Sequence, residues 1–207
     1  MVEIIIVVAV IALLVAMILP AFQRARVKGG PGCYIKLRQI GLTLSEFAGD
    51  NNSHFPPQVA VTNGGSMELV GTGDPAIHFQ TLSNYVSGNW YALHCPGDHS
   101  RQPAAKGSAL EVQNVSYFLS MDAQPEKTNT ILGGDRHLEF AGEPVKPGLF
   151  TLQAEAEVGW TREIHFNQAG VPRRNILFAD AHVENLGTNL PTAIRRQALP
   201  ANRLAVP

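Results

Sequence analysis

The stretch that decides the fold is the apolar run from Ile4 to Leu19, IIIVVAVIALLVAMIL, sixteen residues without a polar side chain. Counted from Met1 to Phe22, a helix would be roughly 33 Å long at about 1.5 Å per residue, close to the thickness of a bilayer core. A secretory signal peptide fits less well, because the basic n-region and the A-x-A cleavage site are missing. With no polar face to turn toward water, the run favours a membrane-inserted helix over a buried core helix.

Charged residues flank this run on both sides. Glu3 would cost about 2.5–3.5 kcal/mol in mid-bilayer and less near the interface. It can therefore sit at the headgroups, or it can wait for a cationic partner such as the N-terminal amine of another subunit. Arg24, Arg26 and Lys28 follow the run. Taken alone, the positive-inside rule would place these three residues in the cytoplasm. This opposes the topology we favour, in which the rest of the chain lies outside the cytoplasm.

Two interruptions separate the apolar segment from the rest of the chain. Pro20 lacks an N–H and predicts a bend or a local opening of the helix. The sequence Gly-Gly-Pro-Gly at 29–32 is a stronger interruption, because a residue before proline is biased away from helical angles. We therefore expect a membrane or filament-core helix over 1–28, a helix break at 29–32, and a globular head over 33–207.

A second helix is predicted from about Cys33 to Ala48, because its apolar residues follow a helical stripe. These residues are Leu37, Ile40, Leu44 and Phe47. Gly49 is the expected residue just beyond the helix, and the sequence at 50–53 reads as a turn. We expect the stripe to pack on a sheet, which is a structural role.

The remainder of the head reads as short strands between turns, which predicts an α+β fold with a mainly antiparallel sheet on the second helix. The expected strands are Ser116–Met121, Thr130–Leu132, Gly148–Gln153, Arg162–Phe166, Asn175–Ala179 and His182–Leu186. The tail from Gly187, which contains three prolines, is expected to be an extended wrap with little regular structure.

The N-terminal sequence resembles a known family. V-E-I-I-I-V-V, a proline seventeen residues after the glutamate, and A-F-Q-R-A-R resemble the N-terminal helix of type IV pilins and type II secretion pseudopilins. In that family a prepilin peptidase removes a basic leader shortly before the glutamate, and the new N-terminus is methylated. We expect such a leader and the first two mature residues to precede Met1, and the leader would supply the cytoplasmic positive charge. The resemblance assigns assembly to Glu3, Ile4, Leu19, Pro20 and Phe22.

The head is similar to one pilin-like group, which carries a prepilin-type processing signature and a C-terminal H-x9-D-G element. The matching segments are C-Y-I-K-L-R-Q-I-G-L-T-L-S-E-F-A-G-D-N-N-S-H-F-P-P from Cys33, C-P-G-D from Cys95, G-D-R-H from Gly134 and N-I-L-F-A-D-A-H-V-E from Asn175. Two departures stand out: His165 lies fifteen residues before Asp180, and Ala181 replaces the glycine. A two-residue turn would force Ala181 to positive φ, so we expect a different turn or a bulge.

Cys33 and Cys95 are the only cysteines. In an exported chain they can form one disulfide that joins the second helix to the body, which would contribute about 2–4 kcal/mol. Free, partly buried cysteines are the alternative. C-P-G-D is not a zinc motif, because no second pair of cysteines completes four ligands.

Three weak candidates for a metal site remain. His165, Asp180 and His182 would suit a divalent transition metal if their strands pair, although an exposed His182 beside a turn is the simpler reading. Asp135 with His137 is a weaker pair. Asp50, Asn51 and Asn52 offer oxygen ligands, and relatives in the secretion branch bind calcium in the head, but the spaced acidic pattern of a calcium loop is absent here. We therefore predict no metal or other cofactor.

Composition excludes some classes of function. The 207-residue chain has 16 Lys+Arg and 17 Asp+Glu, and this balance argues against broad electrostatic binding to nucleic acid. G-x-S-x-G, H-E-x-x-H and phosphate-binding Gly-Lys-Ser/Thr motifs are absent, so we do not expect an enzyme. A metal-dependent hydrolase around His165, Asp180 and His182 is the least favoured reading.

The leading expectation is a structural subunit of a type IV pilus-like or pseudopilus filament. Its partners would be identical subunits in a helical homopolymer, the prepilin peptidase and the assembly machinery. It would lie in the bacterial inner membrane before assembly and in a surface filament or a periplasmic pseudopilus afterwards. The alternative is a membrane-anchored extracytoplasmic binding module that does not polymerise, whose head binds a glycan or a secreted partner.

Overall fold

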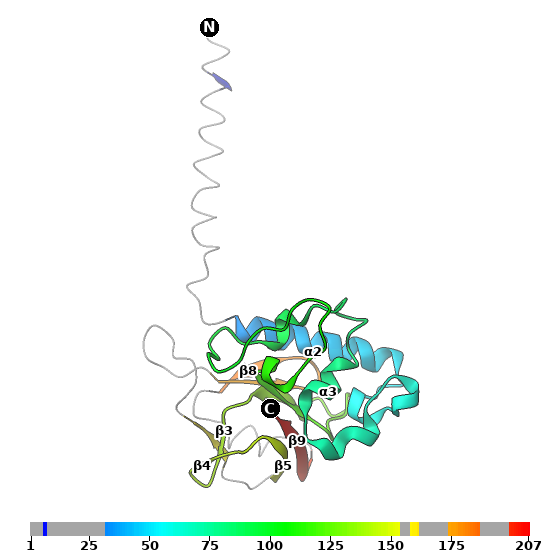
Figure 1. The fold of residues 1–207 in the computed structure, drawn as a ribbon, viewed down its shortest axis with the longest axis vertical. Helices are drawn as coiled ribbons and strands as arrows, with labels where there is room; N and C mark the ends of the chain where they lie inside the picture. The colour runs from blue at the N-terminus through cyan, green and yellow to red at the C-terminus, as the bar shows by residue number, and fades with distance from the viewer. Residues whose placement is uncertain (1–5, 8–31, 154–157, 162–173, 187–198) are drawn as a thin grey trace. The chain divides into compact units, whose positions relative to one another are not determined.

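The structure is a computed structural model that describes residues 6–7, 32–153, 158–161, 174–186 and 199–207 (Figure 1). The chain divides into two compact units, Met1–Gly30 and Pro31–Pro207. In the first unit Ile6 and Val7 are helical. Three predicted features lie outside the described residues: the bend at Pro20, the first three residues of the break at 29–32, and the strand over 162–166.

The second unit is built on a six-stranded antiparallel sheet with the order β5-β9-β1-β2-β7-β8. Its strands are β1 (Tyr117–Ser120), β2 (Ile131–Asp135), β5 (Gly148–Gln153), β7 (Asn175–Phe178), β8 (Val183–Asn185) and β9 (Ala201–Val206). A smaller antiparallel sheet has the order β4-β3-β6, with β3 (Leu138–Phe140), β4 (Glu143–Pro144) and β6 (Val158–Trp160).

Helix α2 (Cys33–Asp50) lies along one side of the large sheet, and short helical turns follow it in the chain before β1 (Figure 1). These turns are η1 (Pro56–Gln58), η2 (Val61–Asn63), η3 (Met67–Thr72), α3 (Pro75–Gln80), η4 (Trp90–Leu93) and η5 (Val112–Asn114). The helix was predicted to end at Ala48, whereas it continues through Gly49 to Asp50. The expected turn follows, with Asn52 and Ser53 in the left-handed region.

The predicted stripe of α2 forms the first hydrophobic core. Leu37, Ile40, Leu44 and Phe47 are all buried and pack with Leu119 and Leu177 of the sheet. Gly41 belongs to the same face, where a Cβ atom would lie 2.6 Å from Leu177 Cδ1 and 3.1 Å from the Cα of Ala181. The missing side chain therefore lets α2 approach the β7–β8 hairpin closely. This packing confirms the prediction of an α+β head with a helix on an antiparallel sheet.

The other face of the large sheet is buried as well. Phe118, Ile176 and Phe178 alternate with the residues of the first core and pack with Leu138 and Trp160 of the small sheet. A strand that is buried on both faces carries apolar residues at successive positions. The strands predicted at Ser116–Met121 and Asn175–Ala179 match β1 and β7 within one residue at either end.

The prediction for the tail was wrong at its end. Ala201–Val206 is β9, an internal strand of the large sheet that lies between β5 and β1. Asn202 explains the position: it is fully buried, its Oδ1 lies 2.5 Å from Ser120 Oγ, and its Nδ2 donates to the Ile131 carbonyl at 2.8 Å. Arg203 adds a paired contact with Asp122 at the surface. Residues 187–198 lie outside the described part of the chain.

The β7–β8 turn partly agrees with the prediction. The Ala181 N–H donates to Phe178 O, and the Phe178 N–H donates to His182 O, both at 2.9 Å. These bonds close a three-residue loop in place of the two-residue turn. Ala181 nevertheless has φ of 63°, so the longer turn does not remove the left-handed conformation that glycine would adopt without strain.

Candidate functional site

The start of α2 is fastened to the loop that follows η4. Cys33 and Cys95 form a disulfide, which is the first of the two alternatives drawn from the sequence. One turn further along, the buried Lys36 donates from Nζ to the carbonyl oxygens of Tyr91 at 2.9 Å and His94 at 2.7 Å. The same ammonium lies 3.5 Å from the centroid of the Tyr91 ring. Burial lowers the pKa of Lys36, and the two carbonyls offset part of that cost.

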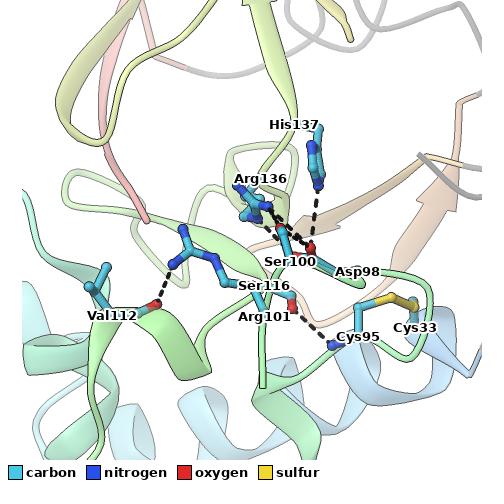
Figure 2. A network of polar contacts seen from close by, with 9 residues as sticks. All are labelled: Cys33, Cys95, Asp98, Ser100, Arg101, Val112, Ser116, Arg136 and His137. Carbon is cyan, nitrogen blue, oxygen red and sulfur yellow. Dashed lines mark hydrogen bonds and ion pairs between the residues drawn. A yellow bond between two sulfur atoms is a disulfide. The ribbon is translucent and has the colours of Figure 1, made fainter. Parts of the chain in front are cut away.

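Asp98 is the centre of a polar network directly beyond this disulfide (Figure 2). Its carboxylate accepts hydrogen bonds from Arg136 Nε at 2.8 Å, from Arg136 Nη2 at 3.1 Å and from Ser100 Oγ at 2.8 Å. His137 Nε2 lies 3.7 Å from Asp98 Oδ1. The network therefore joins C-P-G-D to G-D-R-H, two motifs that lie nearly forty residues apart in the sequence.

The charge on Asp98 is strongly stabilised. Burial works to raise the pKa of this carboxyl, but the close imidazole of His137 and the hydrogen bonds from Arg136 and Ser100 outweigh it and hold the pKa well below its usual range. Nearby, Arg101 donates from Nη1 to the Val112 carbonyl at 3.2 Å. The carboxylate thus stays ionised and saturated with donors, which suits a fixed structural anchor better than a general base.

Asp135, in the adjacent strand, has the opposite environment. It is buried, and its Oδ2 accepts from the Asn175 N–H at 2.7 Å and from Asn175 Nδ2 at 3.0 Å. Its Oδ1 has no hydrogen-bond partner among the described residues. Burial raises the pKa of Asp135 to about 7, although the Asn175 bonds favour the charged form. The structure does not bring Asp135 to His137, whose ring faces Asp98 instead.

The other predicted metal candidates are placed as follows. His182 Nδ1 contacts Asp180 Oδ1, its Nε2 lies 3.6 Å from Glu184 Oε1, and its ring stacks on Phe178 with centroids 4.4 Å apart. His165 lies outside the described residues. Within the described part of the chain, no group of three or more His, Cys, Asp or Glu side chains is arranged to hold a metal ion.

The calcium candidate at the end of α2 is engaged in local contacts. Tyr85 donates from its hydroxyl to Asp50 Oδ2 at 3.0 Å, and Asn51 Nδ2 donates to the Phe47 carbonyl at 2.8 Å. Asn52 adopts φ of 52° in the turn. These contacts describe the end of a helix and its turn, and they give no positive support for a calcium site.

The predicted assembly residues Glu3, Ile4, Leu19, Pro20 and Phe22 lie outside the described residues. Among the helices that the structure does describe, none is both long enough and apolar enough to span a bilayer. Reasoning from the sequence did not identify Lys36 as a tether or Asp98 as the partner of Arg136. The C-P-G-D and G-D-R-H motifs can be seen in the sequence, but the sequence does not show that Asp98 of the first pairs with Arg136 of the second.

Comparisons of this chain with protein-family models, with curated proteins and with solved structures found no match. In the described part of the head, a disulfide and a buried lysine fasten the start of α2 to the loop at 91–95. The ionised Asp98, which follows in the same loop, fastens that loop to Arg136 at the end of β2. This arrangement resists displacement of α2 relative to the sheet.

Proposed function

We propose that this chain is a structural subunit of a type IV pilus-like or pseudopilus filament, which assembles through its N-terminal apolar helix. One observation carries the proposal. A run of sixteen apolar residues, next to a single acid, precedes a helix whose inner stripe packs on the sheet of a separate head. The motifs that resemble type IV pilins and pseudopilins extend this support into the head.

The physical logic is an exchange of surroundings. In the membrane the apolar segment contacts lipid, and in a filament it would contact identical segments, so association depends on side-chain packing. An acid in such a core needs a cation, and the N-terminal ammonium of a neighbouring subunit can supply it for Glu3. Contacts between unlike surfaces that do not close into a ring generate an open helix.

The fastening of α2 supports the same role. A filament subunit that is pulled through its N-terminal segment transmits the load first to the start of α2. The disulfide at Cys33 and the carbonyl bonds of Lys36 lie at that end. Disulfides persist in oxidising compartments, so the bond also supports a location outside the cytoplasm for the head. We propose no catalytic role.

The test is filament assembly by the full chain, expressed behind a prepilin leader in a bacterium that supplies the peptidase and the assembly machinery. We expect sheared surface fractions to contain fibres in electron micrographs. Glu3→Ala and Glu3→Gln should reduce the yield of fibres while the head keeps its disulfide. Glu46→Gln is the matched control, because Glu46 is an exposed acid on α2. Unchanged yield in the Glu3 variants would remove the role of that residue. Only membrane-extracted monomers, with no fibres, would favour the anchored binding module instead.

A further inference from the structure

An open groove of about 460 Å³ lies beside the outer face of α2. It is lined by Gln39, Leu42, Thr43, Val86, Asn89, Tyr91 and Ala92. None of these side chains carries a charge at neutral pH, although about one residue in six of the chain is charged. A nucleotide, a phosphate or an acidic peptide would find no counter-charge in this lining. The ligand class that fits it is neutral.

The floor of the groove is apolar and shallow. A second cavity, of only about 20 Å³, shares Thr43, Val86, Asn89 and Ala92 with the groove and reaches the buried rings of Phe79 and Trp90. A space of this size holds no more than a water molecule, so an anchoring side chain of a peptide could not enter it. The groove can therefore offer a ligand a flat contact but not a deep pocket.

Tyr91 provides an aromatic ring that is exposed yet held in place. It is 61% exposed, which is the largest exposure among the large hydrophobic residues described. The buried ammonium of Lys36 lies against the ring, and Asn89 Oδ1 accepts the Tyr91 N–H at 3.2 Å. Because the residue is fixed from below, little side-chain entropy remains to be lost when a ligand stacks on the ring.

Two amide side chains in the lining retain hydrogen-bonding capacity. Among the described residues, neither the Gln39 amide nor Asn89 Nδ2 has a hydrogen-bond partner, since Asn89 uses only its oxygen to hold Tyr91. A primary amide both donates and accepts, so it can pair with neighbouring hydroxyl groups. A sugar ring combines a flat face of C–H groups with a rim of neutral hydroxyls. It matches an aromatic ring flanked by amides.

We infer that this groove binds a neutral oligosaccharide, which stacks one sugar ring on Tyr91 and hydrogen-bonds Gln39 and Asn89 through its hydroxyls. This activity goes beyond assembly into a filament and does not depend on it. A lipid chain would leave both amides without partners. A charged glycan would meet no charged side chain in the lining, since the nearby Lys36 ammonium is buried beneath the Tyr91 ring and donates to two main-chain carbonyls. Because a lipid chain and a charged glycan both fit the lining poorly, we expect the groove to prefer a neutral sugar.

The test is isothermal titration of the full chain in a detergent without a sugar headgroup, using maltohexaose, cellohexaose and chitohexaose as separate probes. We expect at least one probe to bind with a dissociation constant in the millimolar range or tighter. Tyr91→Ala should weaken that binding about tenfold, the scale of one lost aromatic contact. The variant should stay folded, because Lys36 donates to main-chain oxygens that the substitution keeps.

Tyr34→Ala is the matched control. Tyr34, which lies on α2, is also an exposed tyrosine, at 41%, but it does not line the groove. Its loss should leave the affinity unchanged, and Gln39→Ala should lower it. The inference is overturned if none of the three probes binds at 10-millimolar concentration (roughly the weakest affinity that such a contact would give). Equal losses in Tyr34→Ala and Tyr91→Ala would also overturn it, as would equally tight binding of a heparin hexasaccharide.

Discussion

Breaking the Cys33–Cys95 bond should remove a large part of the stability of the head. The bond closes a loop between residues 62 positions apart. In the chain-entropy description, a crosslink of that span reduces the conformational entropy of the unfolded chain and so raises its free energy by roughly 4 kcal/mol at 25 °C. A domain of this size is stable by about 5–15 kcal/mol in total, so the loss should be easy to measure.

The folded state should change little when the bond is opened. Both cysteines are buried, and the Lys36 bonds to the Tyr91 and His94 carbonyls still hold α2 against the same loop. The effect should therefore arise mainly in the unfolded chain. Alanine is the right replacement, because a serine hydroxyl in this buried place would add a desolvation cost of its own.

The assay is guanidinium unfolding of the oxidised protein, the reduced protein and Cys33→Ala/Cys95→Ala, followed by tryptophan fluorescence. Trp90 and Trp160 are buried in the two different cores, so the signal reports both faces of the sheet. Reduced and doubly substituted proteins should lose about 2–4 kcal/mol, with a larger dependence on denaturant because the open chain exposes more surface.

The single substitutions provide the control for this reasoning. Cys33→Ala and Cys95→Ala each open the same bond, so each should cost about as much as the pair. If the two single losses instead add up to the double loss, the cysteines contribute through separate packing. A loss below about 1 kcal/mol in the double variant would refute the crosslink argument altogether.

Three further predictions concern the polar network and the close contact at α2. Asp98→Asn should lower the free energy of unfolding, measured in urea, by about 3 kcal/mol, because it leaves the partly buried Arg136 guanidinium without its counter-charge. Asp98→Asn/Arg136→Met should lower it by less, and an equal loss in the two variants would contradict the pairing. Asp135 holds its proton in the folded state up to about pH 7, so its contribution to stability should fall as pH rises from about 4 to about 7; Asp135→Asn should flatten that part of the curve, and an unchanged slope in thermal melts would contradict the assignment. Gly41→Val should cost about 1–3 kcal/mol by forcing α2 from Leu177 and Ala181, whereas Gly49→Ala on the same helix, where a Cβ meets nothing within 4 Å, should be neutral or stabilising.

Much of the head could be predicted because its signals are local. The stripe of Leu37, Ile40, Leu44 and Phe47 predicted both the helix and its buried face, and the turn-bounded segments 116–121 and 175–179 predicted strands, which the structure has as β1 and β7. The strand over 148–153 was predicted with its observed bounds. In each case neighbouring residues alone determine the pattern.

What could not be predicted depends on partners that are distant in sequence. The last strand, β9, shows a weak alternation in Asn202, Leu204 and Val206, but prolines on both sides of it hid the strand. Its place in the sheet is fixed by bonds from Asn202 to Ser120 and Ile131, more than seventy residues away. A polar residue in a tail reads as exposed until those partners are known.

The Asp98 network also depends on residues that are distant in sequence. The sequence shows an aspartate after C-P-G and an arginine after G-D, and either would ordinarily be assigned to the surface. Folding brings Asp98 to Arg136, and the aspartate becomes 4% exposed. A buried carboxylate is costly unless it is saturated, and here a guanidinium and a hydroxyl donate to it while an imidazole lies close by. Because this loop also carries Cys95, the ion pair and the disulfide restrain the same segment from two sides, one toward β2 and one toward α2. Loss of either should therefore loosen the attachment made by the other, and a double-mutant cycle between Asp98 and Cys95 should give a coupling energy of about 0.5–3 kcal/mol.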